Sequence, residues 1–300
     1  MIAARERRIE ANSMLLLLLI SLGAAFCFAI VGVLYKLVAL KPWSDDGFRL
    51  VMMALGTFAA GLVWLAGTER PNSTVIYLSL LCGVFGLISL FSVMRSMALG
   101  SGAATWVVLN LSITLVILLA PWLWRESISA RQWSGIAAFV ISVFLFARDR
   151  GEGDKRPISL RWAVPATLMF FMNGLTVVVF KVLDRAVHAP HTFSTLTIYY
   201  GTTTVLLIPV FMYRRWKDVF VKGPEMLTGF VAALGMMVGQ ALLLKAISID
   251  ATTSIPVIHG VNVLVVAIAS SFLFNEKFTR YSTTGVLAGV ASIWLLMMPR

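Results

Sequence analysis

The sequence predicts an all-α integral membrane protein with ten transmembrane helices, arranged as two inverted five-helix repeats. Hydrophobic residues make up 59% of the chain and charged residues 13%, against about 25% charged residues in ordinary soluble domains. The mean hydropathy is +0.88. The long apolar runs lack the polar/apolar alternation of a membrane β-barrel, so the spans are predicted to be helical.

The first span begins close to the N-terminus. Arg5, Arg7 and Arg8 precede an apolar run, as in a signal peptide, but this run continues to Leu40, which is too long for a cleaved segment. A spanning helix needs about 20 mostly apolar residues. The predicted spans cover residues 14–40, 46–67, 73–98, 102–124, 132–147, 162–184, 193–213, 225–248, 251–274 and 281–298.

Matched landmarks near the end of each half indicate the repeat. Gly135 and Ser142 follow a Trp-Leu-Trp-Arg-Glu segment, and Gly285 and Ser292 follow a Phe-Leu-Phe-Asn-Glu segment 150 residues later. Five crossings per repeat, an odd number, place the second copy upside down in the membrane. Many secondary transporters have two such inverted repeats around a central site.

The chain therefore divides into two predicted units. The first repeat covers residues 1–147, with an N-terminal tail over 1–13, and the second covers 162–300. Residues 148–161 combine mixed charge with glycine and proline, which is typical of a solvated linker. The other connections are short, so helices that follow one another in the chain are expected to be antiparallel.

Two further matches carry a family resemblance. Lys36 and Lys181 close the first helix of each half, at an offset of 145, and Glu126 and Glu276 follow the fourth helix of each half. With these features the sequence resembles the drug/metabolite transporter superfamily, specifically its ten-helix EamA-type members. The resemblance covers nearly the whole chain and implies secondary transport. It also implies that both termini lie in the cytoplasm.

The charge balance fits a membrane protein. Lys and Arg total 25 against 14 acidic residues, giving +11; we assign this excess to membrane-flanking residues that meet anionic lipid, not to nucleic-acid binding. The loop charges favour termini outside, whereas the basic N-terminus favours termini inside, so both orientations stay open. Cys27 and Cys82 lie in apolar runs and are expected to be core residues; no metal or cofactor is expected.

Four cations lie within the spans or near their ends: Lys36, Arg95, Lys181 and Lys245. Charged groups within spans are costly and suggest either function or pairing, although a long side chain can also extend to the headgroups. Because these four form two repeat-related pairs, we expect some to line a central site attractive to carboxylate or phosphate. Lys36 and Lys181 are expected to face one another across the pseudo-axis.

Polar and aromatic residues in the spans complete the candidate site. An amide can bind a substrate or bond across helices, and an aromatic ring can stack on a ligand. No aspartate or glutamate lies in the middle of a predicted span, which disfavours a cation/proton exchanger with a membrane-buried carboxylate. With the four cations, the predicted substrate-binding residues are Trp106, Asn110, Tyr200, His259 and Asn262.

These observations predict a secondary transporter, an exporter or exchanger of small polar metabolites, with amino acids or related organic anions as first candidates. The alternatives are a broad-specificity drug exporter and, in another class, a membrane-embedded enzyme. No catalytic motif is present, so an enzyme is not expected. The bacterial inner membrane is the expected location. Gly285-x3-Gly289 fits either a homodimer seam or packing within the chain.

Overall fold

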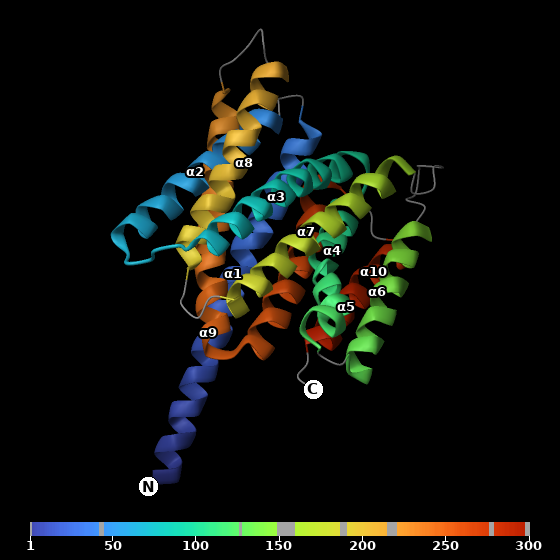
Figure 1. The fold of residues 1–300 in the computed structure, drawn as a ribbon. Coiled ribbons are helices and arrows are strands. Elements are labelled where there is room, and N and C mark those ends of the chain that lie inside the picture. Colours follow the sequence, from blue (N-terminus) through green and yellow to red (C-terminus); the bar gives the residue numbers. More distant parts are fainter. Residues whose placement is uncertain are drawn as a thin grey trace.

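The protein is built of helices (Figure 1). The computed structural model describes residues 2–41, 45–125, 128–148, 160–186, 191–214, 221–275 and 279–297, and these contain ten helices and no strand. The helices are α1 (Ile2–Leu40), α2 (Asp45–Ala66), α3 (Ser73–Leu99), α4 (Gly102–Leu111), α5 (Ile113–Trp124), α6 (Ala130–Arg148), α7 (Leu160–Ala186), α8 (Thr192–Arg214), α9 (Gly223–Phe274) and α10 (Arg280–Met297).

The apolar segments confirm the predicted multi-pass membrane fold. Among the described residues, eight helical segments are long and apolar enough to cross a membrane, and α6 holds a shorter apolar segment, Ala130–Leu145. α1 begins and α10 ends on the same side of the molecule (Figure 1), which we call the terminal face. The opposite side, where α1 ends and α2 begins, is the loop face.

Three predicted spans differ from the structure in their helix boundaries. The fourth span is broken at Ser112 into α4 and α5, where the Ser112 backbone N–H donates to Leu109 O at 3.2 Å in a tighter turn. The eighth and ninth spans, predicted as separate helices, belong to one continuous helical run, α9.

The two spans of α9, Gly223–Leu243 and Val257–Phe274, nevertheless run in opposite directions along α1. As the chain proceeds through the first span, its contacts on α1 move toward the N-terminus of α1, and through the second span they move toward its C-terminus. The chain therefore reverses between the two spans (Figure 1). Gly235 lies at Cys27, Leu242 at Gly23, Ile258 in a cluster with Leu17 and Ala24, and Val266 at Gly32.

Reciprocal hydrogen bonds show that the repeats are inverted. Ser142 Oγ donates to Gly285 O at 2.7 Å, and its equivalent Ser292 Oγ donates to Gly135 O at 2.7 Å. Each glycine precedes its own serine in the chain, so both bonds can form only if α6 and α10 are antiparallel. Equivalent helices that run antiparallel are related by a two-fold axis in the membrane plane, as predicted.

A second pair of equivalent helices, α2 and α8, has the same arrangement. Gly56 lies against Tyr200 and Gly61 lies against Thr197, so these helices are also antiparallel. At their crossing, Thr57 Oγ1 and Thr204 Oγ1 are 3.2 Å apart and share a hydrogen bond. Small residues here allow close approach of the two backbones.

The helix ends repeat as well. α5 is capped at its C-terminus by Arg125 (φ 54°) and α9 by Asn275 (φ 51°). Both capping residues are left-handed, and each donates its backbone N–H to a carbonyl five residues earlier. The landmarks Glu126 and Glu276 lie outside the described residues, as do residues 149–159 of the predicted linker.

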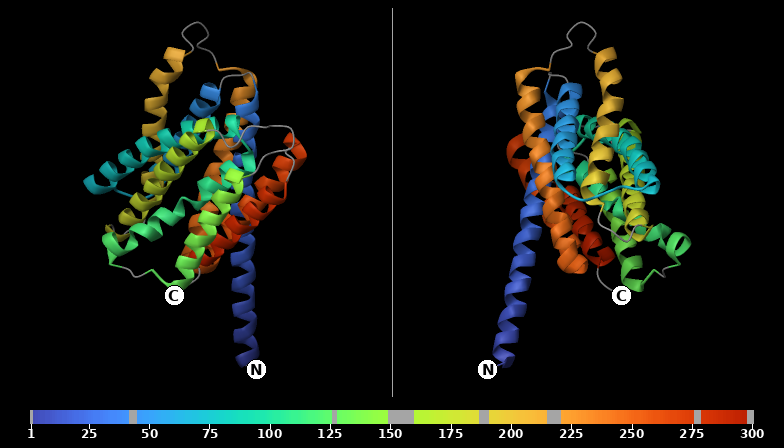
Figure 2. Two further views of the ribbon diagram at one scale, coloured as in Figure 1. Left: turned by 90° about the vertical axis from the view of Figure 1, so that its right-hand side faces the viewer. Right: turned by 60° about the vertical axis from the view of Figure 1, so that its left-hand side comes forward.

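The predicted tail over 1–13 is helical from Ile2, as the first part of α1, and projects beyond the bundle (Figure 2).

The small-residue face at Gly285 and Gly289 is used within the chain. Gly285 accepts the bond from Ser142, and a Cβ at Gly289 would lie 2.7 Å from Val107. The motif is therefore used for packing within the chain, which is one of the two uses expected from the sequence. A homodimer stays a prediction and would need another surface.

The reciprocal bonds predict equal effects of two substitutions. Ser142→Ala and Ser292→Ala should each lower the free energy of unfolding by about 1 kcal/mol, since each removes one buried interhelical bond. Ser134→Ala is the matched control, because its exposed hydroxyl bonds only within its own helix, to Ala130 O. Unfolding in detergent measures the effects; a cost for one buried serine and none for the other would contradict the symmetric arrangement.

Candidate substrate cavity between the repeats

A cavity of about 550 Å³ lies between the two repeats. Its volume falls in the range of small-molecule sites, which is about 300–1,000 Å³. It is lined by residues of α1, α2, α3, α4, α5, α7, α8 and α9, so both halves contribute. The described lining residues include no lysine, arginine, aspartate or glutamate. Its polar side chains include those of Tyr35, Asn110, Asn173, Gln240, His259 and Asn262.

A hydrogen-bond network joins α4 to the second span of α9 at the cavity wall. Trp106 Nε1 donates to Asn262 Oδ1 at 2.9 Å, and Asn262 Nδ2 donates to Asn110 Oδ1 at 3.3 Å. Asn110 Nδ2 donates back to Trp106 O at 2.8 Å. These two helices are equivalent in the repeat, so the network crosses the pseudo-axis.

His259 completes the network. Its Nδ1 lies 2.8 Å from Asn110 Oδ1, and because an amide oxygen carries no hydrogen, Nδ1 must be the donor. In the neutral ring Nε2 is then an acceptor. Nε2 has no partner among the described residues, so it can accept a hydrogen bond from a ligand in the cavity.

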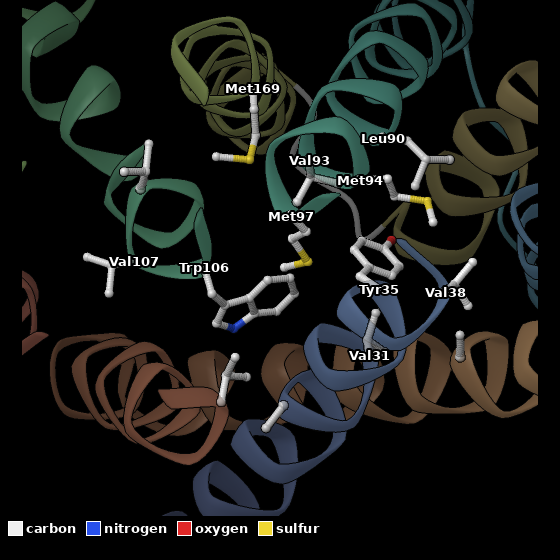
Figure 3. Packing of buried hydrophobic residues seen from close by; sticks show 14 of the residues in the cluster. Val31, Tyr35, Val38, Leu90, Val93, Met94, Met97, Trp106, Val107 and Met169 are labelled. Carbon is white, nitrogen blue, oxygen red and sulfur yellow. The ribbon is translucent and has the colours of Figure 1, made fainter. Parts of the chain in front are cut away.

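Aromatic rings form the wall nearest the loop face. Tyr35 of α1 meets the Trp106 ring edge-on, with centroids 6.0 Å apart, and meets Phe48 edge-on at 5.8 Å. Figure 3 shows Tyr35, Met97 and Trp106 brought together from three helices. Gly32 makes room for the indole, since a Cβ there would lie 2.8 Å from the ring. Trp106 is therefore held in place by packing as well as by its bond to Asn262.

The cavity extends further toward the terminal face than toward the loop face. Its lining includes Val75 in the first turn of α3, Leu183 near the end of α7, and His191 and Thr192 at the start of α8. Toward the loop face the lining of α1 stops at Tyr35, more than a turn before Leu40. The cavity thus approaches the terminal face and stops short of the loop face.

Polar contacts close the loop face above the cavity. Lys36 is 6% exposed, and its Nζ donates to Met97 O at 2.9 Å and Gly100 O at 2.7 Å. This ties α1 to the turn between α3 and α4. Nearby, Asp46 accepts from Arg49 at 2.6 Å and from Arg214 at 3.2 Å, which joins α2 of the first repeat to α8 of the second.

Four of the nine predicted site residues line the cavity, namely Trp106, Asn110, His259 and Asn262. Tyr200 is not among the lining residues, whereas its neighbour Tyr199 is. The Tyr200 ring packs on Gly56, and its buried hydroxyl has no partner among the described residues. Successive helical residues point about 100° apart, which explains an error of one position.

The four predicted cations do not line this cavity. Lys36 bonds to the α3–α4 turn, and Lys181 lies 4.2 Å over the Trp124 ring. Arg95 lies at a second cavity, and Lys245 is exposed.

The expectation that Lys36 and Lys181 face one another is wrong. Lys36 lies at the start of the span Gly102–Trp124 and Lys181 at its end. An in-plane two-fold axis carries a residue near one face to the opposite face, so only residues near the midplane can meet across it.

The structure adds lining residues beyond the nine site residues predicted from the sequence. Asn173 of α7 donates to Ser112 Oγ at 2.6 Å and to Leu109 O at 3.4 Å, so it satisfies the break between α4 and α5. A broken helix at membrane depth needs such partners. Tyr35 and Gln240 also line the cavity. Gln240 is an uncharged polar residue within a predicted span, which is a sequence signal for it, whereas Tyr35 lies five residues before the end of α1.

Comparisons with known proteins agree with this architecture. The family model described as the EamA-like transporter family matches residues 14–148 and 160–298. No curated protein was found to be similar to the chain. A solved structure, described only as the crystal structure of a protein, is similar with a TM-score of 0.56 and 17% identity, over 91% of this chain and 97% of that chain. At this identity the likeness concerns the fold alone.

A double-mutant cycle tests the network across the pseudo-axis. Asn262→Leu leaves the buried Trp106 N–H without an acceptor, and Trp106→Phe leaves the Asn262 carbonyl without that donor, so each should cost about 1–3 kcal/mol of unfolding free energy. The double variant should cost less than the sum, by about 1 kcal/mol, because neither partner is then left unpaired. Additive costs in detergent unfolding would contradict the bond.

Proposed function

Since the chain belongs to the EamA-like transporter family, we propose that it is a secondary transporter that moves small polar metabolites by alternating access. The observation that carries the proposal is a central cavity, built from both repeats, that extends toward one face and is closed off from the other. Binding at such a site, followed by a relative movement of the two halves, is how inverted-repeat transporters work.

The lining supports an uncharged or zwitterionic substrate. Asn110, Asn262 and His259 offer donors and acceptors, and Tyr35 and Trp106 offer aromatic surface. Because none of the four predicted cations lines the cavity, the lining supports amino acids better than organic anions as substrates. The aromatic and methionine residues of the lining support the alternative function, a broad-specificity exporter, with amphipathic compounds as its substrates.

The turn between α3 and α4 is the proposed moving part at the loop face. Gly100 and Gly102 flank Ser101, and the Gly100 carbonyl accepts the Lys36 bond, so movement of this turn would break that bond. The equivalent residues 250–252 lie between the two spans of α9, where the chain reverses, and they include no glycine. The two gates are therefore proposed to differ. We further propose non-enzymatic activity and a bacterial inner-membrane location, on the family resemblance.

Transport in proteoliposomes tests the function. A panel of amino acids, nucleosides and sugar phosphates should include a compound that is taken up by counterflow and recovered chemically unchanged. Asn110→Leu should lower the initial rate about tenfold or more, since it removes the acceptor for His259 and Asn262. Lys181→Gln should transport normally.

The controls separate the alternatives. Lys245→Gln, an exposed position away from the cavity, should leave the rate unchanged. Loss of anion transport in Lys181→Gln with normal transport in Asn110→Leu would overturn the uncharged-site proposal. Chemical conversion of a substrate would favour the membrane-embedded enzyme instead.

A further inference from the structure

A second cavity, of about 610 Å³, opens at the loop face. It lies where the ends of α1, α3 and α8 meet the starts of α2 and α7, and it shares no lining residue with the central cavity. Four cationic side chains from four segments line it: Lys41, Arg49, Arg95 and Arg214. We propose that this cavity is a binding site for a phosphate-bearing anion, separate from the transport site.

Asp45 lines this cavity, Asp46 pairs with two of its arginines, and both carboxylates are already engaged. Arg49, whose side chain is 3% exposed, pairs with both Asp45 and Asp46. Its Nε also donates to Met94 Sδ at 3.1 Å, and its guanidinium lies 4.2 Å over Phe91. Arg214 shares Asp46 at 3.2 Å. The two aspartates are thus both used in ion pairs with two arginines.

Lys41 and Arg95 are the remaining cations of the lining. Within the part of the chain that the structure describes, neither side chain makes an ion pair or hydrogen bond. They come from different elements, the end of α1 and the last turns of α3, yet both border the same hollow. The lining therefore carries two more positive charges than the two aspartates can balance.

An anion is the ligand that this excess favours. Cations gathered around a concave site repel one another, and the low-dielectric walls focus their potential into it. Snorkelling would explain one such side chain, but it does not require two to converge on one hollow. Arginine matches the oxygens of phosphate with paired donors, and lysine adds a point charge. The volume suits a phosphorylated small molecule or a phospholipid headgroup.

Thermal unfolding of the purified protein tests the site in two arms. The first adds inorganic phosphate in neutral detergent, with chloride at matched ionic strength as the reference. The second compares nanodiscs containing phosphatidylglycerol with nanodiscs of phosphatidylcholine alone. We expect a rise in Tm in at least one arm, and the apparent affinity should fall about tenfold in Arg95→Gln and in Lys41→Gln.

Matched variants make the result specific to the cavity. Arg131→Gln removes an exposed arginine outside the cavity and should respond as the parent protein does. Arg95→Lys keeps the charge and should keep part of the affinity. A response to phosphate alone identifies a soluble anion, and a response to phosphatidylglycerol alone identifies a headgroup; either supports the site.

The proposal is overturned if neither arm raises Tm. It is also overturned if Arg131→Gln loses as much affinity as Arg95→Gln, or if both cavity variants bind as the parent does. Should Arg95→Gln fail to fold, Lys41→Gln decides, since Lys41 follows the end of α1. These readouts are binding measurements, so they do not depend on the transport assay.

Discussion

The odd number of crossings in each repeat forces equivalent helices to run in opposite directions, and the rest of the structure follows from this constraint. It allows α6 and α10 to exchange identical serine–carbonyl bonds, and it brings α2 and α8 together through small residues. It also places α4 beside the second span of α9, where Trp106 bonds to Asn262. The second and third of these pairs contribute to the lining of the cavity, together with α1, α3, α5 and α7.

Within a membrane, polar groups of the interior must satisfy one another, and this decides which of them are available to a ligand. The ammonium of Lys36 is used by two carbonyls at the α3–α4 turn, and the amide of Asn173 is used by the break at Ser112. His259 gives one ring nitrogen to Asn110 and keeps the other facing no described partner. The network therefore combines fixed geometry with one ring nitrogen that is available to a ligand.

Much of the architecture could be predicted from the sequence because it depends on composition and on an offset, which a chain displays directly. The sequence could identify four lining residues, because exposing a polar side chain to lipid is costly and such residues within a span therefore face the protein interior. These residues are Trp106, Asn110, His259 and Asn262. Tyr199 in place of Tyr200 could not, since the polar residues of α8 are not confined to one face and the sequence pattern therefore does not show which side of the helix meets the cavity. The lysines misled because their partners are backbone carbonyls and an aromatic ring, which carry no sequence signal.

The most direct test of alternating access is the side from which the cavity can be reached. Ser89 lines the cavity, so Ser89→Cys, in a background without Cys27 and Cys82, can be labelled with a membrane-impermeant thiol reagent applied to either side of oriented vesicles. The account predicts labelling mainly from the terminal face without substrate, and faster labelling from the loop face when a transported substrate is added. Substrate-independent labelling from both faces would indicate a pore and contradict the account.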